Sequence, residues 1–181
     1  MKIYTLKPNN NKAEVFNLEC PLDMFDGISL VAQWIPPRIS RFNVGKMFYD
    51  LMTCDTPSLI ITNENAHHSL QALMLEDAEF LQTTPSNELS ESYYIFNVVK
   101  VIHRALDTSK SKISYFPSGR ILRIYNYVFN DDAKKIINDE VLVFKIDDID
   151  ISPIFVTEKF IDMLKQLHLT RSFDFKEIAE I

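Results

Sequence analysis

Glycine is scarce in this sequence, with only three glycines among 181 residues. Sites that cradle phosphate groups are usually built on glycine-rich loops, so the chain has little material for one. Cysteine is equally rare, and Cys20 and Cys54 have no secretion signal ahead of them. We interpret them as reduced thiols rather than a disulfide framework. A chain of this length buries roughly 70% of its unfolded surface and needs no such cross-link.

Long apolar runs and a positive net charge are also missing. No run approaches the roughly 20 residues that span a bilayer, and residues 1–12 lack the apolar stretch of a signal peptide. The net charge of −6 makes nucleic acid a poor partner, and the longest basic patch, Lys110 to Arg123, holds only four basic residues. We therefore expect a cytoplasmic protein that binds neither membrane nor nucleic acid. Its acidic surface suits a basic protein partner.

The sequence contains no familiar catalytic or metal-binding motif. It lacks H-E-x-x-H and C-x-x-C, and no histidine has another histidine at the i+4 position. Ser118 follows a proline in a predicted turn rather than in a strand-to-helix elbow. Each cysteine lies beside an acidic residue, which opposes formation of a reactive thiolate. We predict no catalytic residue, no metal site and no cofactor.

Strands are predicted where aromatic and β-branched residues gather. The strongest prediction is Tyr93–Val101, and further strands are expected at Ile3–Leu6, Ile113–Phe116, Arg120–Phe129, Val141–Ile146 and Phe173–Ile178. Two amphipathic helices are predicted near residues 63–76 and 157–168. Each follows a short apolar segment and a residue suited to cap a helix.

The order of these elements predicts an α+β fold, in which a mixed, mostly antiparallel sheet is covered by the two main helices. Residues 57–62 and 153–157 both lead through a threonine into a helix, which makes a candidate strand–helix repeat. Two ordinary capped helices explain the likeness equally well. We expect a single domain of residues 1–181. If the repeat is real, its two similar halves cover about residues 1–90 and 91–181.

Two acidic clusters are candidates for contact with a partner. One is the connection that follows the strand expected at Val141–Ile146, and it lacks the spacing, the glycine and the final glutamate of a calcium-binding EF-hand loop. The other follows the first predicted helix. Solvated surface explains such clusters most simply, and a further role would be to face a basic partner. The candidate residues are Asp147, Asp148, Asp150, Glu76, Asp77 and Glu79.

A succession of short apolar motifs carries a family resemblance. In chain order they are Trp34–Pro37, Tyr93–Val98, Leu106-Asp107, Tyr127–Phe129, Val143–Ile146, Ile154–Thr157 and Leu169-Thr170. In this order and spacing they resemble the immunity protein family numbered eleven of bacterial polymorphic toxin systems. Arg171 stands where that family commonly has glycine, and residues 178–181 lack the family's frequent Val-Trp ending.

The resemblance implies an immunity protein that binds a cognate toxin domain and blocks its active site or its access to a target. It brings no catalytic residue with it, and the acidic charge favours a basic nuclease as the toxin. Either a monomer or a homodimer fits. Two other classes stay open. A deep polar pocket around His103 or Ser118 would indicate an enzyme, and a large apolar symmetric interface would indicate a self-assembling structural protein.

Overall fold

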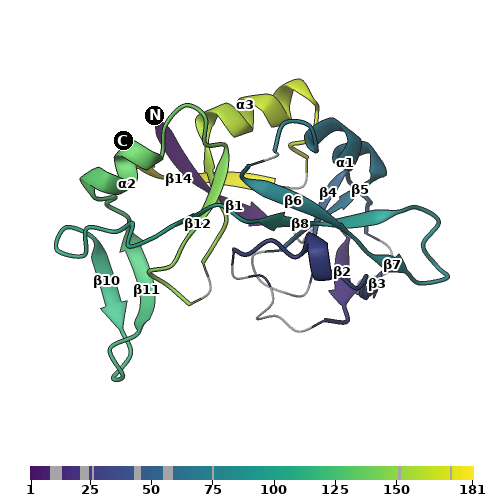
Figure 1. Ribbon diagram of the computed structural model, residues 1–181, viewed down its shortest axis with the longest axis horizontal. Coiled ribbons are helices and arrows are strands. Elements are labelled where there is room, and N and C mark those ends of the chain that lie inside the picture. The colour runs from purple at the N-terminus through teal and green to yellow at the C-terminus, as the bar shows by residue number, and fades with distance from the viewer. Residues whose placement is uncertain are drawn as a thin grey trace.

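The computed structural model describes residues 1–8, 14–20, 25, 27–42, 46–54, 59–74, 76–150, 152–171 and 173–181. Strand makes up 40% of the structure and helix 16%. The expected α+β fold, with a sheet covered by two main helices, is therefore wrong. The chain is mostly β, with two large sheets, a projecting hairpin and short helices along one side (Figure 1).

The first sheet joins the two ends of the chain. Its strands, in order, are β14 (Phe173–Glu180), β1 (Lys2–Pro8), β13 (Phe155–Thr157), β12 (Val143–Ile146) and β9 (Val101–Ile102). β1 is antiparallel to both β13 and β14, and β9 is parallel to β12. The amino group of Met1 donates to the carbonyl oxygen of Ile181 at 2.6 Å, so the two termini lie side by side (Figure 1).

The second sheet is strongly curved. Its strands, in order, are β6 (Ala78–Gln82), β8 (Tyr93–Val98), β5 (Ile60–Asn63), β4 (Leu51–Cys54), β2 (Val15–Leu18), β3 (Arg38–Arg41) and β7 (Thr84–Pro85). The pairs β2/β4 and β3/β7 are parallel, and the others are antiparallel. The outermost strands, β6 and β7, are separated in the chain by Thr83 alone. The sheet therefore curls into a nearly closed, barrel-like form.

The hairpin and the helices lie outside these sheets. They are β10 (Lys112–Tyr115), β11 (Ile121–Asn126), α1 (Glu64–Leu70), α2 (Asp131–Ile136) and α3 (Glu158–Gln166). Asn63 caps α1 by accepting a hydrogen bond from the N–H of Ala66 at 3.0 Å. At α3, Thr157 does not cap with its side chain, because its hydroxyl donates to the carbonyl of Val141 instead. In the part of the chain described, no helix is long and apolar enough to cross a membrane.

Both predicted strand–helix units are present as strand followed directly by helix. β5 runs into α1 and β13 runs into α3, and the two helices lie on the same side of the molecule (Figure 1). Residues 57 and 58 of the first unit lie outside the described residues. The proposed repeat and the two similar halves stay predictions, and β1 pairs with strands from the far end of the chain.

Three apolar clusters form the core. One fills the curved sheet, a second lies between the two sheets beneath α1 and α3, and a third packs α2 against the first sheet. Phe96 and Phe160 meet in the second cluster with ring centroids 6.4 Å apart. In the third cluster Phe144 and Phe155 stack at 5.2 Å. Burying one such side chain contributes roughly 1.5–3 kcal/mol, so the aromatic residues account for much of the stability.

Candidate functional site

The acidic connection after β12 holds the turn that follows β9. Asp147 accepts a hydrogen bond from the N–H of Arg104 at 2.7 Å, and its other oxygen lies 2.8 Å from Nδ1 of His103. Asp148 accepts from the next two N–H groups, at 2.8 and 3.3 Å. Partial burial raises the pKa of Asp147, but the bonds from Arg104 and His103 outweigh it and hold that pKa below its ordinary value.

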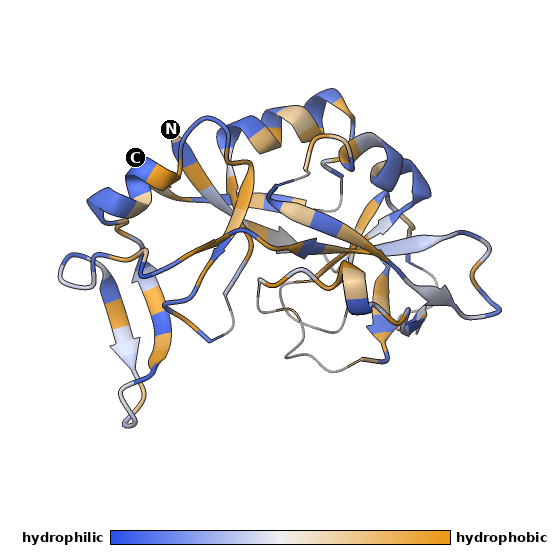
Figure 2. Ribbon diagram, in the orientation of Figure 1, coloured by the Kyte–Doolittle hydropathy of each residue, from blue (hydrophilic) through white to orange (hydrophobic). Residues whose placement is uncertain are grey.

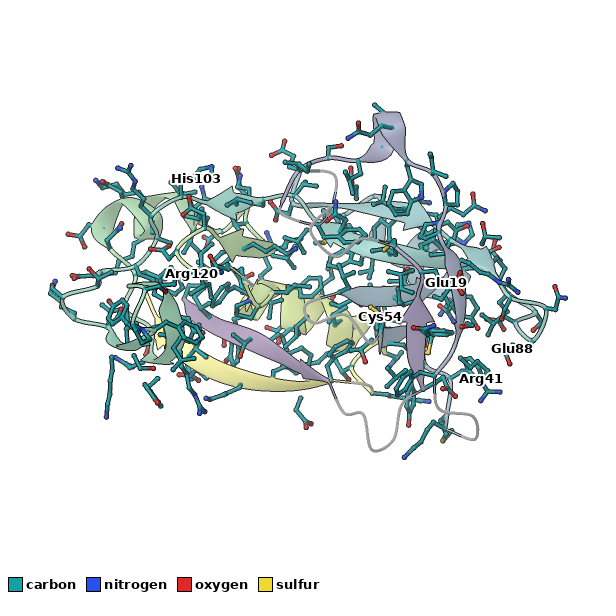
Figure 3. All side chains as sticks on the ribbon, turned by 90° about the horizontal axis from the view of Figure 1, so that it is seen from below. Glu19, Arg41, Cys54, Glu88, His103 and Arg120 are labelled. Carbon is teal, nitrogen blue, oxygen red and sulfur yellow. The ribbon has the colours of Figure 1, made fainter. Side chains whose placement is uncertain are left out.

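Asp150, the last member of this cluster, forms an ion pair with Arg120 of the hairpin. Both side chains are more than half exposed, so the pair contributes little to stability. Figure 3 shows Arg120 and His103 at the end of the molecule opposite Arg41. All three aspartates are thus engaged within the chain, and their role toward a partner stays a prediction.

The second acidic cluster is divided between the interior and the surface. Asp77 is buried and accepts hydrogen bonds from the N–H groups of Leu142 and Val143 at 2.6 and 3.3 Å. Glu79 is half-buried and accepts from the N–H of Leu30 and from Asn97. Glu76 is exposed. The structure therefore gives Asp77 and Glu79 internal partners, which the sequence alone did not reveal.

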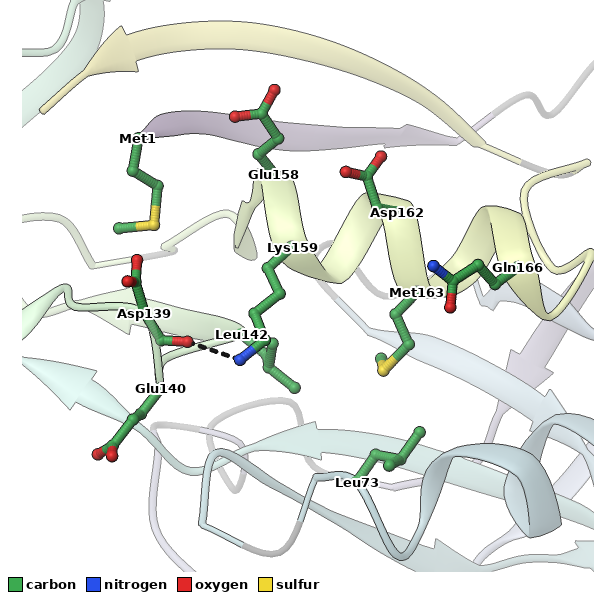
Figure 4. A pocket seen from close by; sticks show the side chains of 10 residues that line it. All are labelled: Met1, Leu73, Asp139, Glu140, Leu142, Glu158, Lys159, Asp162, Met163 and Gln166. Atoms are coloured by element: carbon green, nitrogen blue, oxygen red, sulfur yellow. Dashed lines mark hydrogen bonds between the residues drawn. The ribbon is translucent and has the colours of Figure 1, made fainter.

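A groove of about 1020 Å³ lies beside α3, where four separate parts of the chain meet (Figure 4). Its lining residues are Met1, Leu73, Asp139, Glu140, Leu142, Glu158, Lys159, Asp162, Met163 and Gln166. Apolar side chains from α3 and from the segments after α1 and before β12 make its floor. We call this the α3 groove, and its size is that of a pocket able to take several side chains of a partner.

The spacing of residues on α3 explains why this face is open. Phe160, Ile161 and Leu164 are buried against the core. Glu158, Asp162 and Gln166 recur every four residues, so they line up on another face of the helix. This face lines the groove (Figure 4). The amphipathic pattern that fixes α3 to the core thus also presents two carboxylates to solvent.

The rim of the groove is acidic. Its four carboxylates belong to Asp139, Glu140, Glu158 and Asp162. Among the described lining residues the one cationic side chain is that of Lys159, whose Nζ donates to the carbonyl oxygen of Asp139 at 2.9 Å (Figure 4). Met1 adds the amino group of the N-terminus, which donates to Ile181. Just outside, Lys165 donates to Asp162 at 2.8 Å, and this bond raises the pKa of Lys165. An apolar floor within a negative rim is the arrangement that suits a basic protein surface.

Sequence reasoning missed this groove. Met163 and Leu73 are apolar residues within the two predicted amphipathic helices, whose apolar faces are expected to be buried. Met163 instead lines the groove, and Leu73 is 50% exposed there. The carboxylates of Asp139 and Glu140 precede a predicted strand and gave no signal of their own. The spacing of acidic residues within α3 was the one signal that could have indicated the site.

The histidines lie apart from the groove. His67, on α1, stacks on Tyr94 with centroids 3.9 Å apart and meets the edge of Phe80, and its Nδ1 has no hydrogen-bond partner among the described residues. Burial lowers the pKa of His67, a nearby His68 charge lowers it further, and Glu64 partly opposes both. In the described part of the chain, no three His, Cys, Asp or Glu side chains gather where they could hold a metal.

As the pH is lowered, the protein is expected to lose stability, in part because of His67. Its pKa is below 6.5 in the fold and near 6.5 in the unfolded chain, so protons bind the unfolded state more strongly in that window. The contribution is complete above pH 6.5 and declines as pH falls toward the folded pKa. Between pH 7.5 and pH 5, the free energy of unfolding measured with urea should decrease less for His67→Phe than for the native chain. Equal losses would contradict this assignment.

Residues that would have marked another function lie on the surface or in the core. His103 and Ser118 are exposed, and Ser118 is in the turn of the hairpin. Trp34 donates from Nε1 to the carbonyl of Gln82 at 2.7 Å and packs edge-on against Phe25. Trp34 thus packs against the core of the curved sheet.

One comparison with known proteins bears on this fold and groove. The model of an immunity protein family, Imm11, matches residues 38–180. The chain belongs to the Imm11 family. The resemblance expected from the short apolar motifs is therefore confirmed. No curated protein matches the chain.

The Imm11 match takes in the features described above. Of the residues that line the α3 groove, only Met1 falls outside the matched range. β1 and β2 also precede it, although β1 is an inner strand of the first sheet. Membership supports a role as an immunity protein.

Proposed function

We propose that this protein neutralises a cognate bacterial toxin by direct binding, and that the α3 groove is the contact surface. The observation that carries the proposal is the acidic rim around an apolar floor, in a chain of the Imm11 family. The protein acts as a binding partner rather than a catalyst. It works in the cytoplasm, where a delivered toxin meets its target.

The chemistry of the groove indicates the chemistry of the toxin. Leu73 and Met163 offer apolar contacts that become dry when a partner covers them, and such buried anchors carry most of the affinity of an interface. The surrounding carboxylates attract basic residues and raise the rate of encounter. Nucleases present basic surfaces to phosphate groups. We infer a basic nuclease domain, whose access to nucleic acid is blocked once that surface is covered.

Calorimetry with the purified chain and its cognate toxin domain tests this proposal. We expect a 1:1 complex with nanomolar affinity, which weakens markedly when the salt concentration is raised because the rim charges are screened. Protection of cells that express the toxin should accompany binding. Absence of binding to a folded toxin domain would refute the proposal, and tight binding that salt does not change would refute the acidic contact.

A further inference from the structure

The hairpin of β10 and β11 has a charge opposite to that of the chain as a whole. From residue 108 to residue 130 the sequence contains no aspartate or glutamate, and all 25 acidic residues lie elsewhere. The same stretch contains Lys110, Lys112, Arg120 and Arg123. Lys110 and Arg120 form ion pairs with Asp107 and Asp150, which lie outside this stretch. Lys112 and Arg123, on the two strands themselves, make the hairpin a basic arm on an acidic protein, and the hairpin projects from the body of the molecule (Figure 1).

The arm also exposes large apolar side chains. Figure 2 shows hydrophobic residues on both of its strands. The ring of Tyr125 lies under Arg123 at 5.1 Å and near Lys112 at 5.9 Å, so charge and aromatic surface occur together. About half of the surface is exposed for Tyr115, Phe116, Leu122 and Tyr125. Aromatic residues and arginine are enriched where protein interfaces are strongest, so the arm has the composition of a binding element.

The arm is held in place before any partner arrives. At its base, the N–H of Val128 donates to the hydroxyl of Ser111 at 3.0 Å. Near its tip, Arg120 pairs with Asp150 of the loop after β12. Gly119 takes φ +84° in the turn, a conformation that glycine adopts without strain. A preformed arm loses little conformational entropy on binding, which favours affinity.

The α3 groove on the same chain has the complementary properties. Four carboxylates on its rim face solvent, as do basic side chains of the arm. Its lining includes Met1 and Met163, and methionine sulfur packs well against aromatic rings. A second pocket lies between the hairpin and the loop after β12, and it shares no described lining residue with the α3 groove. One molecule therefore presents the groove and the hairpin surface at the same time. We propose that the hairpin of one molecule docks in the α3 groove of a second copy of the chain.

Two copies that exchange hairpins around a twofold axis form two identical contacts. Each molecule then contributes one arm and one groove, which leaves neither surface unpaired and closes the assembly as a dimer. The doubled contact also helps to reach the roughly 1,200–2,000 Å² that stable interfaces bury. The hairpin and a toxin would compete for the same α3 groove, so the dimer is the form of the chain before it meets a toxin. The inference goes beyond the proposed function, because it requires no toxin.

Sedimentation velocity on the whole chain, without toxin and over a wide range of concentration, tests this pairing. The native chain is expected to form a dimer. A hairpin variant, Lys112→Glu with Arg123→Glu, and a groove variant, Asp139→Lys with Glu140→Lys, should each raise the dimer dissociation constant at least about tenfold. All four side chains are exposed, so both variants should fold, which circular dichroism verifies.

Mixing the two variants gives the decisive result. In a mixed pair, the reversed hairpin meets the reversed groove and the native hairpin meets the native groove, so an equimolar mixture should recover the dimer. A control with Glu19→Lys and Glu91→Lys changes the net charge by the same amount as the groove variant, but at exposed sites outside the groove. This control should remain dimeric. A monomeric native chain, a dimer that survives both variants, or a mixture that stays monomeric would each overturn the proposal. None of these outcomes depends on toxin binding.

Discussion

Replacement of Asp77 by alanine is expected to lower the free energy of unfolding by about 3 kcal/mol. Asp77 is 6% exposed, and its carboxylate accepts hydrogen bonds from the N–H groups of Leu142 and Val143. Its removal leaves buried donors at the start of β12 without their acceptor, and hydrogen bonds to charged groups are worth roughly 1.5–3 kcal/mol each. The bonds also tie the segment before β6 to the other sheet, so both sheets should lose support together.

Urea unfolding and thermal melting measure this effect. For a chain of this size, such a loss lowers the melting temperature by roughly 6–12 °C. Asp77→Asn keeps one acceptor oxygen and should lose less than Asp77→Ala. Glu76→Ala is the matched control, because Glu76 precedes Asp77 in the sequence but its side chain is exposed. This variant should change the free energy of unfolding by no more than about 0.5 kcal/mol. If Asp77→Ala were as stable as this control and bound toxin less well, Asp77 would be a contact residue instead.

The groove variant, Asp139→Lys with Glu140→Lys, is expected to weaken toxin binding about 100-fold. Both side chains are exposed on the rim, so reversal replaces attraction to a basic partner with repulsion while the core stays intact. Like charges that face each other across an interface cost several kcal/mol, and about 2.7 kcal/mol corresponds to this loss. Calorimetry at low salt gives the dissociation constant directly. At high salt, the dissociation constants of the native chain and the groove variant should lie closer together.

Glu19→Lys with Glu91→Lys separates local contact from net charge. The double change alters the total charge by the same amount at exposed positions that do not line the groove. We expect it to bind toxin within a few-fold of the native chain. Equal weakening by both double variants would mean that overall charge, rather than the α3 groove, attracts the toxin.

Local patterns predicted several elements correctly, but not the way they assemble. The dense aromatic and β-branched run from Tyr93 contains β8, although the single strand predicted to Val101 ends at Val98 and β9 belongs to the other sheet. Asn63 caps α1 as a good capping residue should. Register and strand order depend on contacts between distant segments. Nothing near Ile3 indicates that it pairs with Thr157. The curved sheet closes because β7, just after Thr83, bonds to the distant segment around Pro37, and this contact is equally non-local. The sequence therefore predicted two main helices covering a sheet, whereas the structure is mostly strand and its helices are short.

The candidate site shows the same limit. A run of carboxylates in the sequence looks alike whether it faces solvent or bonds to backbone N–H groups, so Asp77 and Asp148 could not be told from surface charges. The α3 groove combines residues 1 and 73, residues 139–142 and α3, which meet only in the folded chain. Side-chain spacing on α3 indicated a polar face, but not the apolar floor beside it.

The position of β1 between β13 and β14 sets an order of events during synthesis. The strands between Val15 and Val98 can pair while the chain is still on the ribosome, but β1 must wait for partners that are translated near the other end. Contacts so distant in sequence form slowly, and the first sheet leaves a strand edge open until then. Under the proposed function, a cell is protected by the copies it has already finished, and a nascent chain gives no protection.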